Sequence, residues 1–160
     1  ALWRAHPPVE GDLAQWGGEL PGFLAARPAV PARLVELAVR LWARHQVERA
    51  PDAVFDGASL ALLAEAPTGL RLRMSPGLRV LELGAEPWVI WRRGWRAAEA
   101  PLSDAEAFLM RALGAQDLHH ALEQALVAHP DFDFSNWLTR AIEQAWLQGA
   151  YVETSNAIDQ

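Results

Sequence analysis

Hydrophobic positions in the second half of the chain recur with the period of an α-helix in three consecutive segments. In the first, Ser103 and Glu106 have the spacing of a capping box, in which each side chain hydrogen-bonds the backbone of the other. Asp117 is the expected N-cap of the second, and Gly149 is expected to end the third. The sequence therefore predicts three helices, with approximate ranges 103–113, 117–129 and 135–148.

Between residues 70 and 100 the pattern changes from a period of 3.6 to a period of two, which is typical of half-buried strands. The first two runs flank Pro76-Gly77, so we expect them to pair as a hairpin. A return strand is expected at the end of the chain. The predicted strands are Leu70–Met74, Leu78–Leu83, Trp88–Arg93, Trp95–Ala100 and Gly149–Glu153.

The first 68 residues have helical periodicity interrupted by prolines. Helices are expected over Asp12–Leu24, Pro31–Arg49 and Leu60–Ala66. In the second of these, the apolar stripe is expected to face the core and the charged side to face solvent. The stripe consists of Leu34, Leu37, Ala38, Leu41, Trp42 and His45, and the charged side of Arg33, Glu36, Arg40 and Arg44.

These elements predict an α+β fold with two parts, a helical part over residues 1–68 and a sheet with a winged-helix-like ending over residues 69–160. A winged helix serves two kinds of protein, DNA readers and small modules that clamp peptides. A DNA reader places its third helix in the major groove. The outward residues of that helix would here include Asn136, Thr139, Arg140 and Gln144.

Charge distinguishes these two functions. The chain carries a formal net charge of −6, and residues 102–160 alone hold nine acidic residues against two arginines. Because DNA affinity depends largely on neutralising phosphates with basic residues, an acidic helical segment disfavours DNA binding. A DNA-binding transcriptional regulator remains the alternative interpretation.

Arginine is concentrated in the strands. Residues 69–101 hold six arginines and three acidic residues. Three interpretations stay open for this cluster: a solvated sheet face, a docking surface for an acidic peptide or partner subunit, and a phosphate site. Exposed tryptophans at a sheet edge are good interface anchors. The candidate peptide- or partner-binding residues are Arg71, Arg73, Trp88, Arg92, Arg93, Trp95 and Arg96.

Little in the sequence indicates catalysis, a cofactor or a metal. No cysteine is present, which excludes thiolate nucleophiles and thiolate metal sites. His119 and His120 are adjacent on a helix and so point in different directions, and no phosphate-binding loop or nucleophile elbow occurs. No apolar run is long enough to cross a membrane, and no signal peptide is visible, so the expected location is the cytoplasm. We expect a protein that is not an enzyme.

Several short motifs follow one another in a distinctive order. They are His6-Pro7-Pro8 with Gly11-Asp12-Leu13, the helix Leu34–Trp42, the strands from Leu70 to Leu83, Val89-Ile90-Trp91-Arg92 with Gly94, and Pro130-Asp131-Phe132-Asp133. In this order and spacing they resemble the HvfC/BufC family, which is also described as a DNA-binding domain. The resemblance covers nearly the whole chain. Two features of the family are missing, a preceding helical region and a longer insert near Gly84–Pro87. The chain is therefore expected to be the C-terminal portion of a longer protein.

The resemblance implies a function. Members of this family are encoded beside multinuclear non-haem iron oxygenases, and resemble the partner subunits that present a ribosomally made precursor peptide for cysteine modification. The winged-helix element of such pathways holds a leader peptide by adding it to a sheet edge as a strand. Exposed edges can accept an extended peptide in this way. We therefore expect a non-catalytic accessory protein that binds a short precursor peptide and an iron oxygenase.

Overall fold

The computed structural model describes Arg4, Pro7 and residues 15–153, except for the side chain of Trp16. Asp12, the expected cap of the first helix, and the motif around His6 lie outside the described residues. The helices are the 3₁₀ turn η1 (Trp16–Glu19), α2 (Leu20–Ala25), α3 (Ala32–Glu48), the 3₁₀ turn η2 (Ala58–Ala61), α4 (Leu62–Glu65), α5 (Asp104–Leu113), α6 (Leu118–Ala128) and α7 (Phe134–Glu143). The strands are β1 (Leu70–Met74), β2 (Leu78–Leu83), β3 (Glu86–Arg93), β4 (Arg96–Pro101) and β5 (Leu147–Val152).

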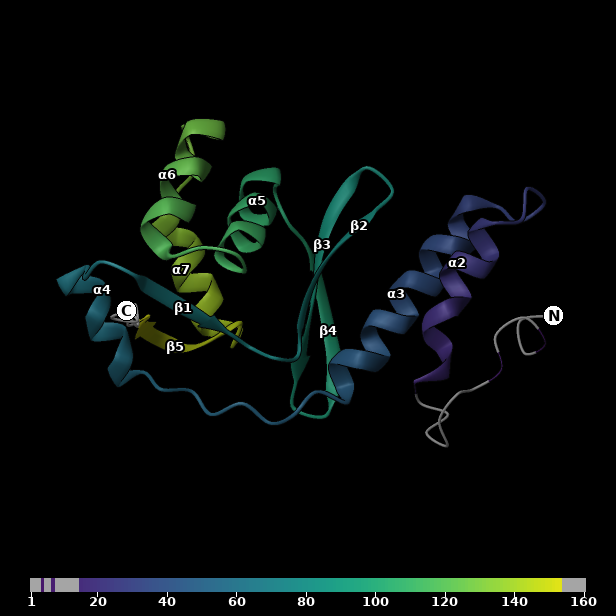
Figure 1. Ribbon diagram of the computed structural model, residues 1–160, viewed down its shortest axis with the longest axis horizontal. Coiled ribbons are helices and arrows are strands. Elements are labelled where there is room, and N and C mark those ends of the chain that lie inside the picture. Colours follow the sequence, from purple (N-terminus) through teal and green to yellow (C-terminus); the bar gives the residue numbers. More distant parts are fainter. Residues whose placement is uncertain (1–3, 5–6, 8–14, 154–160) are drawn as a thin grey trace, which may run out of the picture.

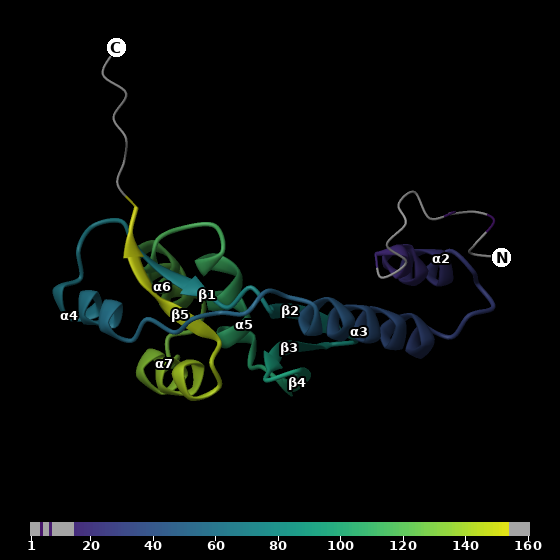
Figure 2. The same ribbon diagram turned by 90° about the horizontal axis from the view of Figure 1, so that it is seen from below.

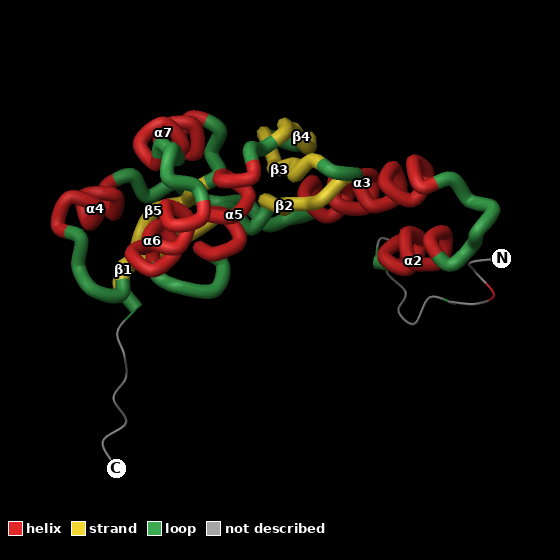
Figure 3. Tube along the Cα trace, turned by 90° about the horizontal axis from the view of Figure 1, so that it is seen from above, coloured by secondary structure: helices red, strands yellow, loops and turns green. Residues whose placement is uncertain are grey.

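The fold is α+β, as predicted, and the molecule is elongated (Figures 1 and 2). Helices α2 and α3 form an antiparallel pair at one end, and α4, α6, α7 and the β1–β5 pair lie at the other. Between them stands an antiparallel sheet with strand order β2-β3-β4. Figure 3 shows β4 as the outermost strand of this sheet, on the same side of the molecule as α7.

The predicted hairpin of the first two strands is wrong. Strand β1 pairs with β5, and β2 pairs with β3. The linking segment 75–77 passes from one sheet to the other, because Ser75 N–H donates to Trp146 O (2.8 Å) and Gly77 O accepts from Arg92 N–H (2.8 Å). Alternation showed that both runs are half-buried strands, but partner choice depends on segments distant in sequence.

The turn between β3 and β4 contains Gly94 and Trp95. Gly94 has a φ of +63°, and Trp95 is not among the described residues with positive φ. This is the pattern of a type II′ turn, which suits a tight hairpin. Trp95 therefore lies at the tip of the hairpin, and the strand predicted to begin there begins at Arg96.

Helix α3 packs on the β2-β3-β4 sheet with a face that only partly coincides with the predicted stripe, of which Ala38 alone is buried. Its buried residues are Ala38, Ala43 and Val47. Leu34, Leu37 and Leu41 are 44–56% exposed. The small side chains on the buried face let α3 approach the sheet closely. In this orientation the three leucines point toward solvent. Arg40 and Arg44, from the predicted charged side, point toward the sheet and contact Glu99 on β4.

The C-terminal helices follow their predicted caps. The Ser103–Glu106 capping box forms at α5, and Asp117 caps α6. Helix α7 is capped by Asp133 and ends at Glu143, which corrects its predicted end at Gly149. Gly149 instead lies within β5.

The end of α7 is a Schellman motif. Trp146 N–H donates to Ala141 O (2.8 Å), and Ala145 N–H donates to Ile142 O (3.0 Å). Ala145 has a φ of +56° and takes the left-handed position that glycine usually occupies. Ending the helix here buries Trp146 in the main core beside Trp91 and Trp137. Residues 58–65 of the expected helical part pack against this same core.

Candidate functional site

The structure separates the predicted binding residues into two regions. Arg71 and Arg73 lie on β1, in the β1–β5 pair, where Arg71 pairs with Glu153 (2.5 Å) and Arg73 lies over the ring of Tyr151 (5.2 Å). Trp88, Arg92, Arg93, Trp95 and Arg96 all belong to the β3–β4 hairpin. The arginine cluster seen in the sequence is therefore not one surface.

Two hairpin residues have structural roles. Arg92 is mostly buried and holds the loop after α3, pairing with Asp52 (2.7 Å) and donating to Ala50 O. Trp88 is half-buried beneath the guanidinium of Arg40 (5.1 Å). Neither residue is free to anchor a partner without breaking these contacts.

The other three hairpin residues form an exposed cationic surface. Trp95 is 83% exposed, and the side chains of Arg93 and Arg96 flank it in sequence and are also exposed. Neither arginine forms an ion pair within the described part of the chain. We refer to Arg93, Trp95 and Arg96 as the hairpin tip. An exposed tryptophan beside unpaired arginines is typical of a binding surface.

Among the strands that the structure describes, none pairs with the outer edge of β4. Hydrogen bonds near both ends of β4 show which way its backbone groups point. Ala97 N–H points away from β3 and donates to Glu48 Oε1 (3.0 Å). Leu102 N–H points toward β3 and donates to Pro87 O (2.8 Å). Because backbone groups alternate along an antiparallel strand, Glu99 directs both N–H and C=O outward.

Both ends of this edge are partly occupied. At one end Glu48 holds Ala97 N–H, and at the other Pro101 has no N–H and its carbonyl accepts from Arg140 (3.3 Å). Between them, no partner is found in residues 15–153 for the backbone N–H and C=O of Glu99. We refer to residues 97, 99 and 101 as the β4 edge.

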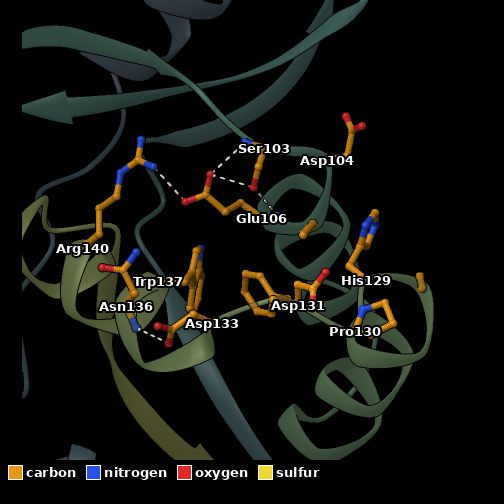
Figure 4. Close-up of a pocket in the computed structure, with 13 residues that line it drawn as sticks. Ser103, Asp104, Glu106, His129, Pro130, Asp131, Asp133, Asn136, Trp137 and Arg140 are labelled. Atoms are coloured by element: carbon orange, nitrogen blue, oxygen red, sulfur yellow. Dashed lines mark hydrogen bonds and ion pairs between the residues drawn. The ribbon is translucent and has the colours of Figure 1, made fainter.

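A hollow of about 700 Å³ is lined by Ser103 and by Arg140, which donates to Pro101 O, so it lies at the end of the β4 edge opposite the hairpin tip. Figure 4 shows its lining residues. It is lined by the first turns of α5 and α7 and by the α6–α7 loop. Four carboxylates belong to it, those of Asp104, Glu106, Asp131 and Asp133, against one arginine, Arg140. We call it the acidic hollow. Sequence reasoning missed it, although the acidic balance of residues 102–160 was a signal.

The residues proposed for DNA reading do not form a cationic face. Arg140 donates to Glu106 (2.8 Å) and lies over the ring of Trp146 (4.9 Å). Thr139 is exposed, and its hydroxyl donates to Ser135 O (2.9 Å), while Asn136 lies in the first turn of α7 and Gln144 is its C-cap residue. The single arginine of this face is thus neutralised by a glutamate.

An ion-pair cluster fixes α3 to β4 behind the edge. Glu99 accepts from Arg40 Nε (2.7 Å) and Arg44 (3.2 Å). The hydrogen bond from Arg40 lowers the pKa of Glu99 below its ordinary value, although partial burial opposes the shift. Arg40 and Arg44 were predicted to be solvated, and this cluster corrects that prediction.

No metal-binding arrangement is found in the described part of the chain, where no group of three or more histidines or carboxylates is close enough to hold an ion. His120 instead pairs with Asp117 (2.8 Å), the cap of α6. The hydrogen bond from the backbone N–H of His120 lowers the pKa of Asp117.

None of the helices described is long and apolar enough to span a lipid bilayer. No protein-family model matches the chain, and neither a curated protein nor a solved structure is significantly similar to it.

Proposed function

We propose that the protein is a non-catalytic accessory subunit that binds a short precursor peptide and a partner iron oxygenase in a peptide-modifying pathway. The observation that carries this proposal is the β4 edge. An extended peptide that pairs with Glu99 N–H and C=O would extend the β2-β3-β4 sheet by one strand, which is a common mode of peptide recognition. The exposed Trp95 beside this edge supplies an apolar anchor.

A second surface supports the partner part of the proposal. Leu34, Leu37 and Leu41 are spaced at i, i+3 and i+7, and so lie along one side of α3. All three are exposed, and with Leu83 and Trp88 the first two line a hollow of about 420 Å³. A row of exposed leucines on a helix is typical of a site that docks another protein. We refer to these three leucines as the leucine ridge.

The partner is tested by purification from native lysate, with and without nuclease, followed by mass spectrometry and iron analysis. An iron-containing oxygenase is expected in both samples. The variant Leu37→Gln with Leu41→Gln should lose it, whereas the control Val127→Gln, at a 79% exposed position on α6, should retain it. If only nucleic acid co-purifies and salt removes it steeply, the protein is the DNA-binding regulator instead.

The peptide is tested by amide hydrogen exchange. The N–H of Glu99 should exchange quickly in the free protein, and slowly when the short cysteine-containing peptide encoded near the oxygenase is added. The N–H of Glu82, on the outer edge of β2, is the matched control and should not change. Protection of Glu82 N–H but not of Glu99 N–H would show that the peptide pairs with β2 rather than β4, and would contradict the proposal.

A further inference from the structure

The two ends of the β4 edge carry opposite charge. At the Arg96 end, the hairpin tip presents Arg93 and Arg96, both exposed. The nearby carboxylates of Asp52 and Glu48 are engaged, one by Arg92 and the other by Ala97 N–H. At the Pro101 end, Arg140 joins the edge to the acidic hollow.

The acidic hollow retains carboxylates that its own fold does not use. Asp133 caps α7, and Glu106 pairs with Arg140 and caps α5. For Asp104 and Asp131, both exposed, no ion pair exists among the described residues. The hollow therefore attracts a positive charge.

Trp137 places a buried hydrogen-bond donor at the wall of the hollow. Its side chain is 1% exposed and lines the hollow, yet its indole N–H has no hydrogen-bond partner in the described structure. In Figure 4 the indole nitrogen lies at the end of the ring nearest to Glu106 and Arg140. The buried indole N–H groups of Trp91 and Trp146 likewise have no partner in the described structure, but of the three only Trp137 lines the hollow. An N–H needs an acceptor, so a main-chain carbonyl of a bound peptide would suit this donor, whereas an arginine side chain would not.

We infer that the β4 edge, if it binds a peptide as proposed above, selects an extended segment with a basic N-terminal end and an acidic C-terminal end. The charges set the order: the basic end lies over the acidic hollow and the acidic end lies at the hairpin tip. Strand β4 runs from the tip to the hollow, so a segment in this orientation is antiparallel to it. Antiparallel pairing is also slightly more stable per residue than parallel pairing.

The length of the segment follows from the length of β4. Arg96 to Pro101 spans about 17 Å at the rise of an antiparallel strand. A peptide with its charged groups about six to eight residues apart reaches both ends. Main-chain bonds to Glu99 and Ala97 O would provide affinity in the middle, and the charges would provide direction.

The test uses two blocked, fluorescently labelled peptides of the same composition. One is Arg-Arg-Thr-Val-Thr-Val-Thr-Val-Glu-Glu, and the other has the arginine and glutamate pairs exchanged. Fluorescence anisotropy is expected to give roughly tenfold tighter binding of the first peptide at low salt, because each charged end contributes a surface ion pair or two. Raising the salt to about 0.5 M should shrink the difference, because exposed charges are screened.

Two variants assign the preference to the two ends. Asp104→Asn with Asp131→Asn removes charge from the hollow, and Arg93→Gln with Arg96→Gln removes it from the tip. Each should reduce the preference to about threefold, since one of the two charged contacts remains. The control Glu65→Gln with Glu123→Gln, at exposed positions on α4 and α6, should leave it unchanged.

Hydrogen exchange of Glu99 separates the possible failures. If the exchanged peptide binds equally or more tightly and still protects Glu99 N–H, the inferred direction is wrong while strand addition stands. If both peptides bind without protecting Glu99, they bind elsewhere, and the inference fails. If neither binds at millimolar concentration, strand addition at the β4 edge fails, and the inferred direction fails with it.

Discussion

Arg40 on α3 donates hydrogen bonds to both carboxylate oxygens of Glu99 on β4, residues that are 59 positions apart in the chain. The glutamate side chain is 17% exposed, and Arg44 also donates to it (3.2 Å). A bidentate arginine–carboxylate pair is geometrically specific. This contact fixes α3 across the sheet and so decides which side of α3 faces solvent.

Replacing Glu99 should destabilise the protein. In Glu99→Gln the carboxylate that accepts from two arginines is lost, and we expect the free energy of unfolding to fall by about 1–3 kcal/mol. Chemical denaturation of the two proteins measures the difference. The control Glu86→Gln removes an exposed glutamate from the neighbouring strand and should change stability by less than about 0.5 kcal/mol. Equal effects would mean that the ion-pair cluster does not contribute.

The same pair should make stability depend on pH. The folded-state pKa of Glu99 lies below its ordinary value, so the folded state favours the ionised form. Its contribution is therefore complete above the ordinary glutamate pKa of about 4.3 and is lost as the pH falls through the lower, folded-state value. The difference between wild type and Glu99→Gln should be constant near pH 7 and shrink below about pH 4. A difference that grows on acidification would contradict this assignment.

Glycine at position 145 should stabilise the protein. Ala145 has a φ of +56°, a conformation that costs an ordinary residue about 1–2 kcal/mol. Part of this gain is offset by the greater freedom of glycine in the unfolded chain, so we expect Ala145→Gly to add about 0.5–1 kcal/mol. Ala112→Gly, within α5, is the control and should destabilise by about 1 kcal/mol. Thermal and chemical denaturation should agree on opposite signs for the two variants.

Gly149 should not tolerate a side chain. Its φ is +153°, and an added Cβ would lie 3.0 Å from Asp56 O and closer still to Ser59 Oγ. The start of η2 is held there, since Ser59 Oγ accepts from Ala150 N–H (2.9 Å). Gly149→Ala should therefore destabilise by more than about 2 kcal/mol.

Gly94→Ala provides the comparison for this clash. Gly94 has a φ of +63° but no neighbouring atom within 4 Å of an added Cβ, so only backbone strain applies, about 1 kcal/mol. Equal losses at the two positions would show that the approach of residues 56–59 to β5 is not tight.

Substitutions on the buried side of α3 should destabilise the protein far more than substitutions on its exposed side. Val47 is fully buried against the sheet, so Val47→Ala should lose about 1–3 kcal/mol. Leu41 is 56% exposed, and Leu41→Gln should change stability by less than about 0.5 kcal/mol. If Leu41→Gln is the more damaging of the two in the isolated protein, the leucine ridge is part of the core, as the sequence pattern suggested.

Local chemistry in the sequence determined most of the elements. The capping box at Ser103 and the cap at Asp117 specify helix starts through bonds within a few residues. Strict alternation over residues 70–74 identified the first strand, because side chains of a strand alternate between its faces, and the run 78–83 after the Pro76-Gly77 turn identified the next. These features depend only on neighbours in sequence, so they can be inferred without a structure.

Features that depend on distant contacts could not be inferred in this way. The end of α7 was placed too late because Ala145, not a glycine, takes the left-handed position, and the burial of Trp146 favours it. The acidic hollow is assembled from two helix starts and a loop, and the free groups of Glu99 follow from which strands pair. The candidate site was therefore only partly predictable, through Arg93, Trp95 and Arg96.

The sequence by itself determined an α+β chain with five strands and the C-terminal helices, since periodicity and capping act locally. Only the tertiary structure decided that β1 pairs with β5, that α3 turns its leucines outward, and that opposite charges flank the β4 edge. The physical reason is that an amphipathic pattern specifies that a face can be buried but not what buries it. The Arg40–Glu99 pair and the small residues of α3 made that choice.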